Sequence, residues 1–585
     1  MVSQTVTWTV LPNGVKNGRL QLSVFVSPRL VADQPEDTLT QFTDWHDWPR
    51  KPVEFYVTVG DAPEVKATPV GPAPRSDLWT KLFTKDSRVF SSNGARAAAL
   101  EQRVIRSAPT KTVKDLVRDE YSALGAWWST SPPTAYTYYP PGCGGGSDGS
   151  GGANGANGAS PSPSPSPTGG GEDPPTRPRL KLHRARLAPY EREEIGAAIK
   201  RVLERQRFVT GTEPEFDGKQ DKAAFLLLEQ FHRRDKANNP QPPDQPPPPP
   251  SALADEPPRL DFHTAIGSIV EYPPLLRMFG LVRDISIPLP AASSSVLVKV
   301  RPVWTHIANS VDQTPATECA ITSTSFVAVA SADTFIKNGL LELERPEFDV
   351  IDIDPDAAAA KIAVSAETLA NVAYDPARRT LPQPPPALES RGLSLTQTNR
   401  AEKLDALLNK AVALEASLQS KTLAEMVVRA EDINRGFRLD VWDDATKAWH
   451  SLCLRKGSYT FAGMTVNVDD EGAIVPAHTE QEQQQDATIY LHESLARWAG
   501  YSLVAPRPGK GTSDSGELVG GDTDPDPSFN LKATFKAAPG TLPKLRYGRS
   551  YKLRARTADL AGNGLRLSDV PANAPQTSET IKYRR

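Results

Sequence analysis

The stretch GFRLDVWDDATKAWHSLCL, residues 436–454, carries the clearest structural signal in the chain. Its two halves are rich in apolar and aromatic residues, and the polar segment between them, residues 443–447, contains residue types that favour turns. This pattern predicts a β-hairpin. Runs rich in β-branched and aromatic residues also occur at 52–59, 458–468 and 545–558, so we expect strands there. The predicted fold is multidomain and mainly β, with α+β parts, antiparallel β-sandwich-like domains, helical insertions and disordered linkers.

The composition permits globular domains and excludes several classes of protein. The chain has 585 residues, enough for about three or four domains of about 150 residues each. Its net charge of −3 provides no basic excess, so we expect no nucleic-acid partner. Three cysteines cannot form a disulfide scaffold. No apolar run reaches the roughly 18 residues that a membrane helix needs, so we expect no membrane span.

Proline is frequent, with 55 residues in 585, above the usual level of about 5%. Seventeen of these prolines fall in two spacers, residues 142–178 and 238–258, which also contain most of the low-complexity sequence. Such segments bury too little apolar surface to fold, so both are predicted to be disordered linkers. The remaining prolines are spread along the chain, which favours short strands joined by turns.

The two ends of the chain each carry a prediction: the first residues concern the site of synthesis, and the last residues concern a strand. The first eight residues, MVSQTVTW, lack the basic segment and apolar segment of a signal peptide. We therefore expect cytoplasmic synthesis, which is compatible with later release as part of an assembly. Residues 581–585 have a strand-like pattern. They either begin a further strand of a longer polypeptide or close the last sheet.

Changes in pattern divide the chain into nine segments. These are a β-rich α+β domain (1–141), a disordered Gly/Ser/Pro linker (142–178), a helical island (179–237), a Pro-rich linker (238–258), a β-rich domain (259–396), a long amphipathic helix (397–430), a β-rich domain (431–506), a flexible loop (507–529) and a final β segment (530–585). Within the first domain, residues 93–105 have a helical pattern. The helix at 397–430 is expected to pack on its own domain, with pairing to a partner protein as the alternative.

Acidic residues cluster at three places, but none has the spacing of an EF-hand. That loop needs glycine at its sixth position and glutamate at its twelfth. Counted from Asp352, the sixth residue is Ala357, and counted from Asn467 the twelfth is His478. The third cluster, at 522–526, lies in the predicted flexible loop. All three are predicted to be solvated turns, and we assign no metal or cofactor site.

Three other groups of residues were weighed as chemical sites. His450 and Cys453 would point to opposite faces of a strand, so we predict a hydrogen-bonded histidine and a buried thiol. Residues 508–512, PGKGT, lack the Ser or Thr that follows the lysine of a P-loop. Residues 145–149, GGSDG, match G-x-S-x-G inside a glycine tract without the flanking strand and helix. No catalytic residue is assigned, and we predict that the protein is not an enzyme.

Aromatic side chains are concentrated in the predicted first domain, where they either form a binding surface or pack in a core. They are Trp45, Trp48, Trp127, Trp128, Tyr136, Tyr138 and Tyr139. Such side chains can form a platform for sugars, but burial in a core or packing at the edge of a loop is the favoured interpretation.

The segment RYGRSYKLRARTADLAGN, residues 546–563, carries a local resemblance to a known fold. Its alternating residues from Tyr551 to Thr557 place one face inward, and Asp559 begins a turn. The segment, about 545–565, resembles the penultimate strand and turn of bacterial immunoglobulin-like or fibronectin type III-like β-sandwich domains. The resemblance implies an Ig-like fold for 530–585 and no catalytic residue. As a whole, the chain resembles large uncharacterised bacterial proteins, which implies no activity.

Two functional interpretations follow from these patterns. The first is a non-enzymatic structural or interaction protein, a β-rich scaffold component of a larger bacterial assembly such as a phage-tail-like or secretion-associated particle, with protein partners. The alternative is a hydrolase or carbohydrate-active protein with Ig-like accessory domains. That alternative needs two carboxylates in a pocket beside Trp45 and Trp48, or beside Trp127 and Trp128. The patterns leave a small-molecule ligand unspecified.

Overall fold

The computed structural model describes residues 2–34, 37–89, 104–108, 261–290, 295–304, 311–313, 317–322, 325–353, 392–419, 427–461, 463–475, 478–479, 488–508, 511–512, 518–519 and 531–584. This part of the chain is mainly β, as predicted, with several antiparallel sheets and few helices. All of it belongs to one compact unit, built from Met1–Leu116, Phe216–Ala363 and Ala387–Arg585. Both predicted linkers and the predicted helical island lie outside the described residues.

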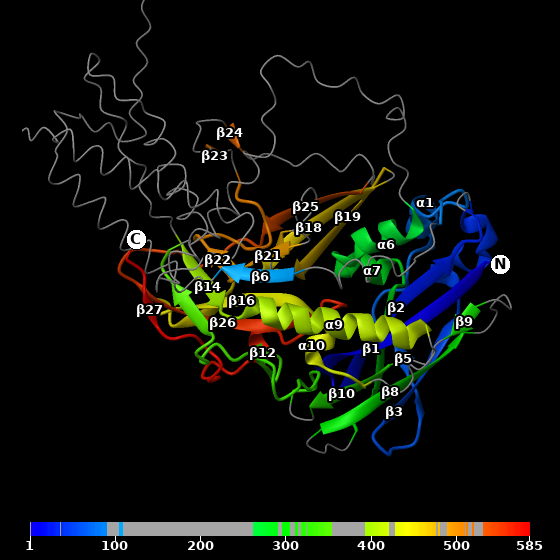
Figure 1. Cartoon of the computed structure of the whole chain (residues 1–585), viewed down its shortest axis with the longest axis horizontal. Helices are drawn as coiled ribbons and strands as arrows, with labels where there is room; N and C mark the ends of the chain where they lie inside the picture. The colour runs from blue at the N-terminus through cyan, green and yellow to red at the C-terminus, as the bar shows by residue number, and fades with distance from the viewer. Residues whose placement is uncertain are drawn as a thin grey trace, which may run out of the picture. The chain divides into compact units, whose positions relative to one another are not determined.

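The chain opens with a long antiparallel hairpin of β1 (Ser3–Lys16) and β2 (Arg19–Val31) (Figure 1). Its turn, Asn17-Gly18, has φ angles of 53° and 69°, a backbone that an Asn-Gly pair adopts with little strain. Val6, Trp8 and Val10 alternate toward a core. The sheet has the order β5-β7-β2-β1-β9, and its other strands are β5 (Thr68–Pro69), β7 (Val282–Pro288) and β9 (Val311–Gln313).

A second sheet shares this core. Its order is β15-β10-β8-β3-β4, with β15 (Val427–Val428), β10 (Glu318–Thr322), β8 (Ser295–Trp304), β3 (Val53–Val59) and β4 (Val65–Lys66). Trp8 from the first sheet, Trp304 from the second and Trp48 from the segment between β2 and β3 lie with ring centroids 5.0 to 6.5 Å apart. These rings bury a large apolar area between the sheets.

Short helices cover the same core. They are α1 (Ser76–Leu82), α6 (Phe262–Val270), α7 (Pro273–Met278) and α10 (Ala430–Ile433), together with the 3-10 helices η1 (Leu39–Gln41), η2 (Thr43–Trp45) and η3 (Trp48–Arg50). A further 3-10 helix, η5 (Leu567–Asp569), buries none of its residues and lies near β17. The carboxylate of Asp261 caps α6 by accepting the backbone N–H of His263 at 2.8 Å. Pro273 begins α7, where its missing N–H has no cost.

The hairpin predicted at 436–454 is confirmed. β16 (Asn434–Asp443) and β17 (Ala448–Ser451) are antiparallel, and β26 (Ser550–Asp559) pairs with the other side of β16. The order of this sheet is β11-β12-β26-β16-β17, with β11 (Ile336–Lys337), β12 (Leu340–Leu341) and β27 (Ile581–Lys582), which also pairs with β26. A smaller sheet has the order β13-β14-β22, with β13 (Phe348–Ile351), β14 (Leu393–Gln397) and β22 (Ser494–Trp498). Apolar side chains of both sheets form a second core around Tyr551 and Trp498.

Three small sheets complete the described part. They are β19-β18-β25, with β19 (Met464–Glu471), β18 (Leu454–Phe461) and β25 (Leu531–Ala537); β20-β21-β6, with β20 (His478–Thr479), β21 (Thr488–His492) and β6 (Val104–Ala108); and the pair β23 (Gly511–Thr512) and β24 (Leu518–Val519). Tyr459 and Phe461 of β18 belong to the first core, so this strand joins the C-terminal part to the N-terminal sheets.

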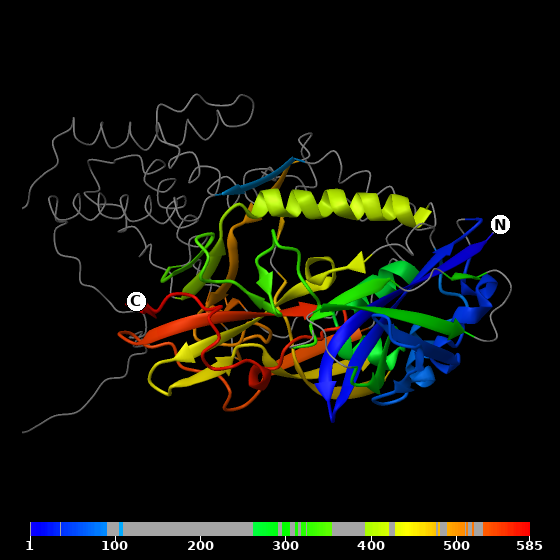
Figure 2. The ribbon, with the colours of Figure 1, turned by 90° about the horizontal axis from the view of Figure 1, so that it is seen from below.

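The long helix α9 (Arg400–Gln419) packs on its own unit. It runs beside β6 and β21 (Figures 1 and 2). Lys410 forms an ion pair with Asp432, and the ammonium group of Lys403 lies 5.1 Å from the ring centroid of Phe335. The helix is shorter than the predicted 397–430, because the predicted segment begins at the end of β14 and includes the β-branched pair of β15 near its end.

Strand pairing crosses the predicted domain boundaries. β2 of the predicted domain 1–141 pairs with β7 of the predicted domain 259–396. β18 of the predicted domain 431–506 pairs with β25 of the segment 530–585. These segments are therefore parts of shared sheets and not separate modules. Local patterns identify a strand, but the choice of its partner depends on residues hundreds of positions away.

Three local predictions also needed correction. The single strand predicted at 458–468 is divided between β18 and β19, with a turn at Gly463, whose φ is 74°. The predicted loop 507–529 contains β23 and β24. The helical pattern at 93–105 ends in a strand, because the β-branched pair Val104-Ile105 begins β6, which pairs in parallel with β21.

Candidate functional site

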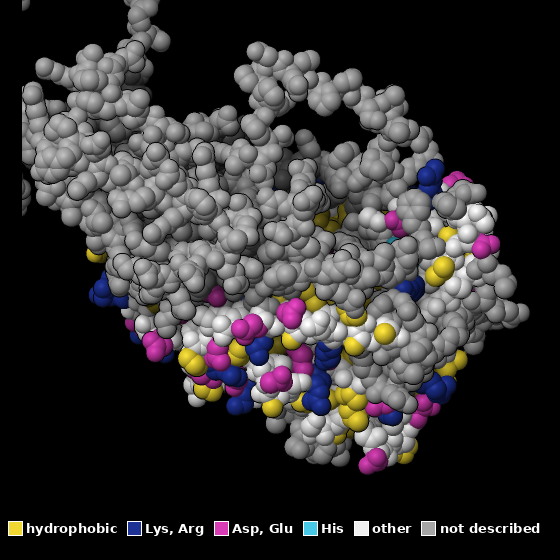
Figure 3. Space-filling view, in the orientation of Figure 1, with side chains coloured by type: hydrophobic (Ala, Val, Ile, Leu, Met, Phe, Trp, Pro, Cys, Tyr) yellow, Lys and Arg dark blue, Asp and Glu magenta, His cyan; other side chains and the backbone are white. Residues whose placement is uncertain are grey.

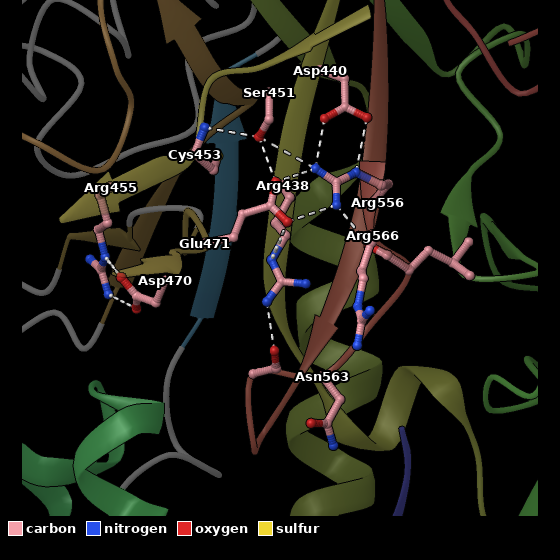
Figure 4. Close-up of polar contacts among 12 residues, drawn as sticks. Arg438, Asp440, Ser451, Cys453, Arg455, Asp470, Glu471, Arg556, Asn563 and Arg566 are labelled. Atoms are coloured by element: carbon pink, nitrogen blue, oxygen red, sulfur yellow. Dashed lines mark hydrogen bonds and ion pairs between the residues drawn. The ribbon is translucent and has the colours of Figure 1, made fainter. Parts of the chain in front are cut away.

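A cluster of buried charges lies on the face of β16 and β26 that is opposite the second core (Figure 4). Side chains alternate along a strand, so Leu439 and Val441 of β16 face the core and Asp440 between them faces the other side. The same alternation in β26 places Arg554 and Arg556 beside Asp440. The strand order of the sheet therefore assembles the cluster.

Two arginines share the carboxylate of Asp440. Arg554 donates to Oδ2 from Nε at 3.1 Å and from Nη2 at 2.9 Å. Arg556 donates from Nε to Oδ2 at 2.9 Å and from Nη2 to Oδ1 at 2.7 Å. None of the three side chains is more than 1% exposed. Burial of this kind is tolerated only because the charges are paired and hydrogen-bonded.

Arg556 also links this pair to a third strand. Its Nη1 donates to Oε2 of Glu471, at the end of β19, at 2.9 Å, and its Nη2 contacts Oε1. Ser451 donates from Oγ to the same Oε1 at 2.5 Å and accepts the backbone N–H of Cys453 at 3.2 Å. Arg556 therefore connects β16, β26 and β19 through two carboxylates.

The outer side of the cluster is covered by an aromatic ring and a loop. The guanidinium carbon of Arg554 lies 4.4 Å from the ring centroid of Trp449, whose indole N–H donates to the carbonyl of Ala572 at 3.1 Å. Arg438 donates to the carbonyl of Gly562 at 2.6 Å. These contacts hold the side chains of Arg554 and Arg438 in place.

The protonation states of the cluster suit a structural role. Burial raises the pKa of Glu471, but the hydrogen bonds and charge of Arg556 outweigh burial and hold that pKa below its usual value. Burial lowers the pKa of Arg554. Burial also lowers the pKa of Arg556, but its bonds to Glu471 and Asp440 prevail and raise it. Glu471 is thus ionised at neutral pH and has no proton to donate.

A second polar cluster forms in the turn after β26. The Oδ1 atom of Asp559 accepts the backbone N–H of Ala561 at 2.9 Å and of Asn563 at 2.8 Å, and Oδ2 accepts the side-chain amide of Asn563 at 3.1 Å. Arg277 of α7 then donates to Oδ1 of Asn563 at 2.8 Å and to the carbonyl of Ala561 at 2.7 Å. Arg277 also pairs with Asp284 of β7 at 2.7 Å.

Burial raises the pKa of Asp559 to about 6, against the opposing effect of its hydrogen bonds from Asn563 and the charge of Arg277. The turn therefore holds a carboxyl group whose protonation changes just below neutral pH. It also docks the sheet of β26 against α7 and β7, since Arg277 contacts both sides of that junction.

The acidic clusters weighed in the sequence are not brought together as a metal site. Asp352 lines a cavity of about 390 Å³ beside β13 and β27, and the rest of its cluster lies outside the described residues, as does the cluster at 522–526. The prediction of a turn at 467–472 is wrong for most of that cluster: Asn467, Asp469 and Glu471 lie on β19, because Val466 and Val468 alternate with them. Within the described ranges, no group of three or more His, Cys, Asp or Glu residues is placed to hold a metal ion.

The prediction for His450 and Cys453 is confirmed. The Nε2 atom of His450 lies 3.1 Å from Oγ1 of Thr446, and the thiol of Cys453 is fully buried. Burial raises the pKa of Cys453 to about 12. Of the P-loop-like residues 508–512, Gly511 and Thr512 form β23. Residues 145–149 lie outside the described residues.

Trp45 and Trp48 are core residues, as the favoured interpretation predicts. Both are fully buried, and their ring centroids are 5.0 Å apart. The indole N–H of Trp45 donates to Gln4 at 3.0 Å and that of Trp48 to the carbonyl of Gly280 at 3.0 Å. Their faces are therefore closed to a sugar. The other aromatic residues weighed, from Trp127 to Tyr139, lie outside the described residues.

Neither polar cluster was predicted from the sequence, although Asp559 was expected to begin a turn. A partial signal was present: Asp440, Arg554 and Arg556 alternate with the apolar residues of their strands. Nothing in the sequence around Arg277 indicates its role, because that role depends on a turn almost three hundred residues further along the chain.

Two further observations bear on the class of protein. In the described part of the chain, no helix is both long and apolar enough to cross a membrane. Comparison with protein-family models, with curated proteins and with solved structures found no match to this chain.

Proposed function

We propose that this chain is a non-enzymatic structural or interaction protein, a β-rich scaffold component of a larger bacterial assembly. A phage-tail-like or secretion-associated particle is the concrete form of this proposal. Protein partners are part of the proposal, and so is release after cytoplasmic synthesis as part of the assembly.

The observation that carries the proposal is that the buried carboxylates are paired with arginines. Asp440 and Glu471 are both occupied by arginines, so neither is presented to a substrate. Buried ion pairs contribute little net stability but can specify one arrangement of strands. The cluster on Arg556 and the turn at Asp559 each join strands that are far apart in the sequence. A rigid arrangement of many sheets is what a scaffold needs.

The resemblance to Ig-like domains supports the proposed architecture. We infer that the sheets of β26 and β14 form a β-sandwich. The Tyr551 hydroxyl donates to the carbonyl of Lys544 at 2.7 Å and accepts the N–H of Arg546 at 2.9 Å. This is the arrangement of a tyrosine corner, which immunoglobulin-like sandwiches use near the start of a strand. The ring of Trp498 packs edge-on against Tyr551 at 5.4 Å.

The first of the two aromatic surfaces that the hydrolase alternative needs is not exposed. It needed carboxylates in a pocket beside Trp45 and Trp48, and both rings are fully buried in the first core. It now depends on Trp127 and Trp128, which lie outside the described residues.

The proposal is tested by purifying the tagged full-length protein from its native host after brief chemical cross-linking. We expect one set of partner proteins in stable proportion to the chain, retained through size-exclusion chromatography. A protein that migrates as a free monomer with no partner, with and without cross-linker, would argue against a scaffold. Hydrolysis of a panel of glycosides that survives in the variant Glu471→Gln and is lost on mutation of another carboxylate would favour the alternative.

A further inference from the structure

The turn before β26 and the strand β27 together present an exposed cationic surface. Residues 544–550 and 579–584 contain five Lys or Arg residues and one acidic residue, Glu579, in a chain whose net charge is −3. We define the cationic patch by its exposed side chains, which are Lys544, Arg546, Tyr547, Lys582 and Arg584. Figure 3 shows Lys and Arg side chains at the left edge of the molecule, where Figure 1 places β27 and the C-terminus.

The patch is held rigidly from beneath. The backbone N–H of Gly548 donates to the carbonyl of Tyr583 at 2.7 Å, and the N–H of Tyr583 donates to the carbonyl of Arg549 at 2.9 Å. Gly548 has a φ of 79°, which glycine adopts without strain. The hydroxyl of the buried Tyr551 holds the start of the turn. The two segments are therefore fixed side by side, and binding would not have to order them.

Some exposed cations of this protein are paired with a carboxylate. Lys66, Arg75 and Arg301 each form an ion pair with a nearby carboxylate. Among the described residues, none of the four cations of the patch forms an ion pair with a carboxylate. Arg549, in the same turn as Arg546 and Tyr547, forms an ion pair with Asp443 and is left out of the patch for that reason.

Tyr547 gives the patch an aromatic centre. Its side chain is 76% exposed, more than any other large hydrophobic residue in the described part of the chain. Tyr and Arg are the residue types that dominate the energetics of protein interfaces, because they combine apolar area with hydrogen bonds. An exposed tyrosine on a rigid turn next to Arg546 has this character.

We propose that the cationic patch binds an extended acidic segment of a partner protein. This inference rests on the proposed function as an interaction protein and names the chemistry of one partner. The patch spans only one turn and one two-residue strand, whereas nucleic acid is bound along a longer basic stripe of a basic protein. Lys582 and Arg584 also line the cavity beside β27, together with Glu344, Asp349 and Asp352, so we place the acidic segment over Arg546 and Tyr547, away from those carboxylates.

The test measures binding of a fluorescein-labelled oligoglutamate peptide to the full chain by fluorescence anisotropy at low salt. The charge-reversal variant Arg546→Glu/Lys582→Glu/Arg584→Glu should weaken binding by about tenfold or more, and added salt should weaken binding to the wild type. The matched control, Lys81→Glu/Lys85→Glu/Lys536→Glu, reverses three exposed cations elsewhere and should weaken it far less. A second variant, Tyr547→Ser, keeps every charge and should still weaken binding several-fold.

Three results would overturn the inference: no binding of the peptide at low salt, equal loss in the patch and control variants, or tighter binding of a single-stranded oligonucleotide of equal net charge. The proposed function is judged separately. If the wild type and the patch variant retain the same partners from the native host, the scaffold role stands and the patch is wrong. If neither retains a partner, the scaffold role fails, while the peptide measurement still decides the patch.

Discussion

Arg277 and Asn563 are 286 positions apart in the sequence, and a hydrogen bond of 2.8 Å joins their side chains. Arg277 lies on α7, which packs on the first core, and Asn563 lies in the turn that leaves the sheet of the second core. The turn and α7 also approach closely at this point: a Cβ atom on Gly562 would lie 2.7 Å from the ring of Pro273. This junction is one of the places where the C-terminal part of the described chain is attached to the first core, in addition to β18.

Removing the guanidinium at this junction should destabilise the protein. In Arg277→Met, the carboxylate of Asp284, the amide oxygen of Asn563 and the carbonyl of Ala561 all lose a donor. We expect the free energy of unfolding to fall by about 2–4 kcal/mol. Urea unfolding followed by the fluorescence of the buried tryptophans measures this change.

The matched control for this prediction is Arg75→Met. Arg75 also pairs with a carboxylate, that of Asp77, but both side chains are substantially exposed. Its loss should cost no more than about 0.5 kcal/mol. Equal losses in the two variants would show that the junction contributes no more than a surface ion pair.

The charge cluster gives a second prediction. In Asp440→Asn, the guanidinium groups of Arg554 and Arg556 stay buried, but a shared negative charge is gone. Breaking a buried pair from one side costs about 3–5 kcal/mol, so the thermal midpoint should fall sharply. Asp469→Asn, which breaks the exposed pair with Lys456, should change the stability by less than about 1 kcal/mol. A stable Asp440→Asn protein would contradict the account of the cluster as a structural device.

Much of this fold could be predicted from local patterns, and the reason is physical. The hairpin at 436–454 was correct because alternating side chains and a polar turn are local properties. Helix α6 ends before Pro273, where α7 begins, because proline cannot continue a helix. Asn17-Gly18, a strong local signal for the first hairpin, was overlooked, although its positive φ angles follow from those two residue types.

The polar clusters could not be predicted in the same way. Each of them depends on which strands become neighbours, and strand pairing joins residues such as Leu340 and Arg556 that no local pattern relates. Asp559 could be placed in a turn from residue type alone. Arg277, the residue that makes the turn part of a junction, could not be identified from any pattern near it in the sequence.

The two buried carboxylates should make opposite contributions to the pH dependence of stability. The pKa of Glu471 is lowered on folding, so its contribution is present above pH 4.5 and is lost as the pH falls through its folded pKa. The pKa of Asp559 is raised from 3.8 to about 6, so its contribution is fully present below pH 3.8 and is lost as the pH rises through about 6.

The variant Asp559→Asn tests this second contribution, because it cannot titrate. From about pH 4 to about pH 7, the stability of the wild type should fall relative to that of the variant. Urea unfolding of both proteins across this range provides the comparison, and Glu471→Gln serves as the control of opposite sign. A constant difference between wild type and Asp559→Asn at every pH would mean that Asp559 does not change its protonation in this window.

Gly564, at the end of the same turn, should be a position that tolerates no side chain. Its φ is 150°, a conformation that other residues rarely adopt, and a Cβ atom there would lie 2.3 Å from the carbonyl oxygen of Thr557. Backbone atoms cannot move aside as a flexible side chain can, so Gly564→Ala should lower the free energy of unfolding by more than about 2 kcal/mol. Gly14 has a φ of 70° but no atom within 4 Å of its Cβ position, so Gly14→Ala should cost only about 1 kcal/mol. Equal losses would show that the turn relaxes around the added methyl group and that the close approach to Thr557 is not what requires glycine.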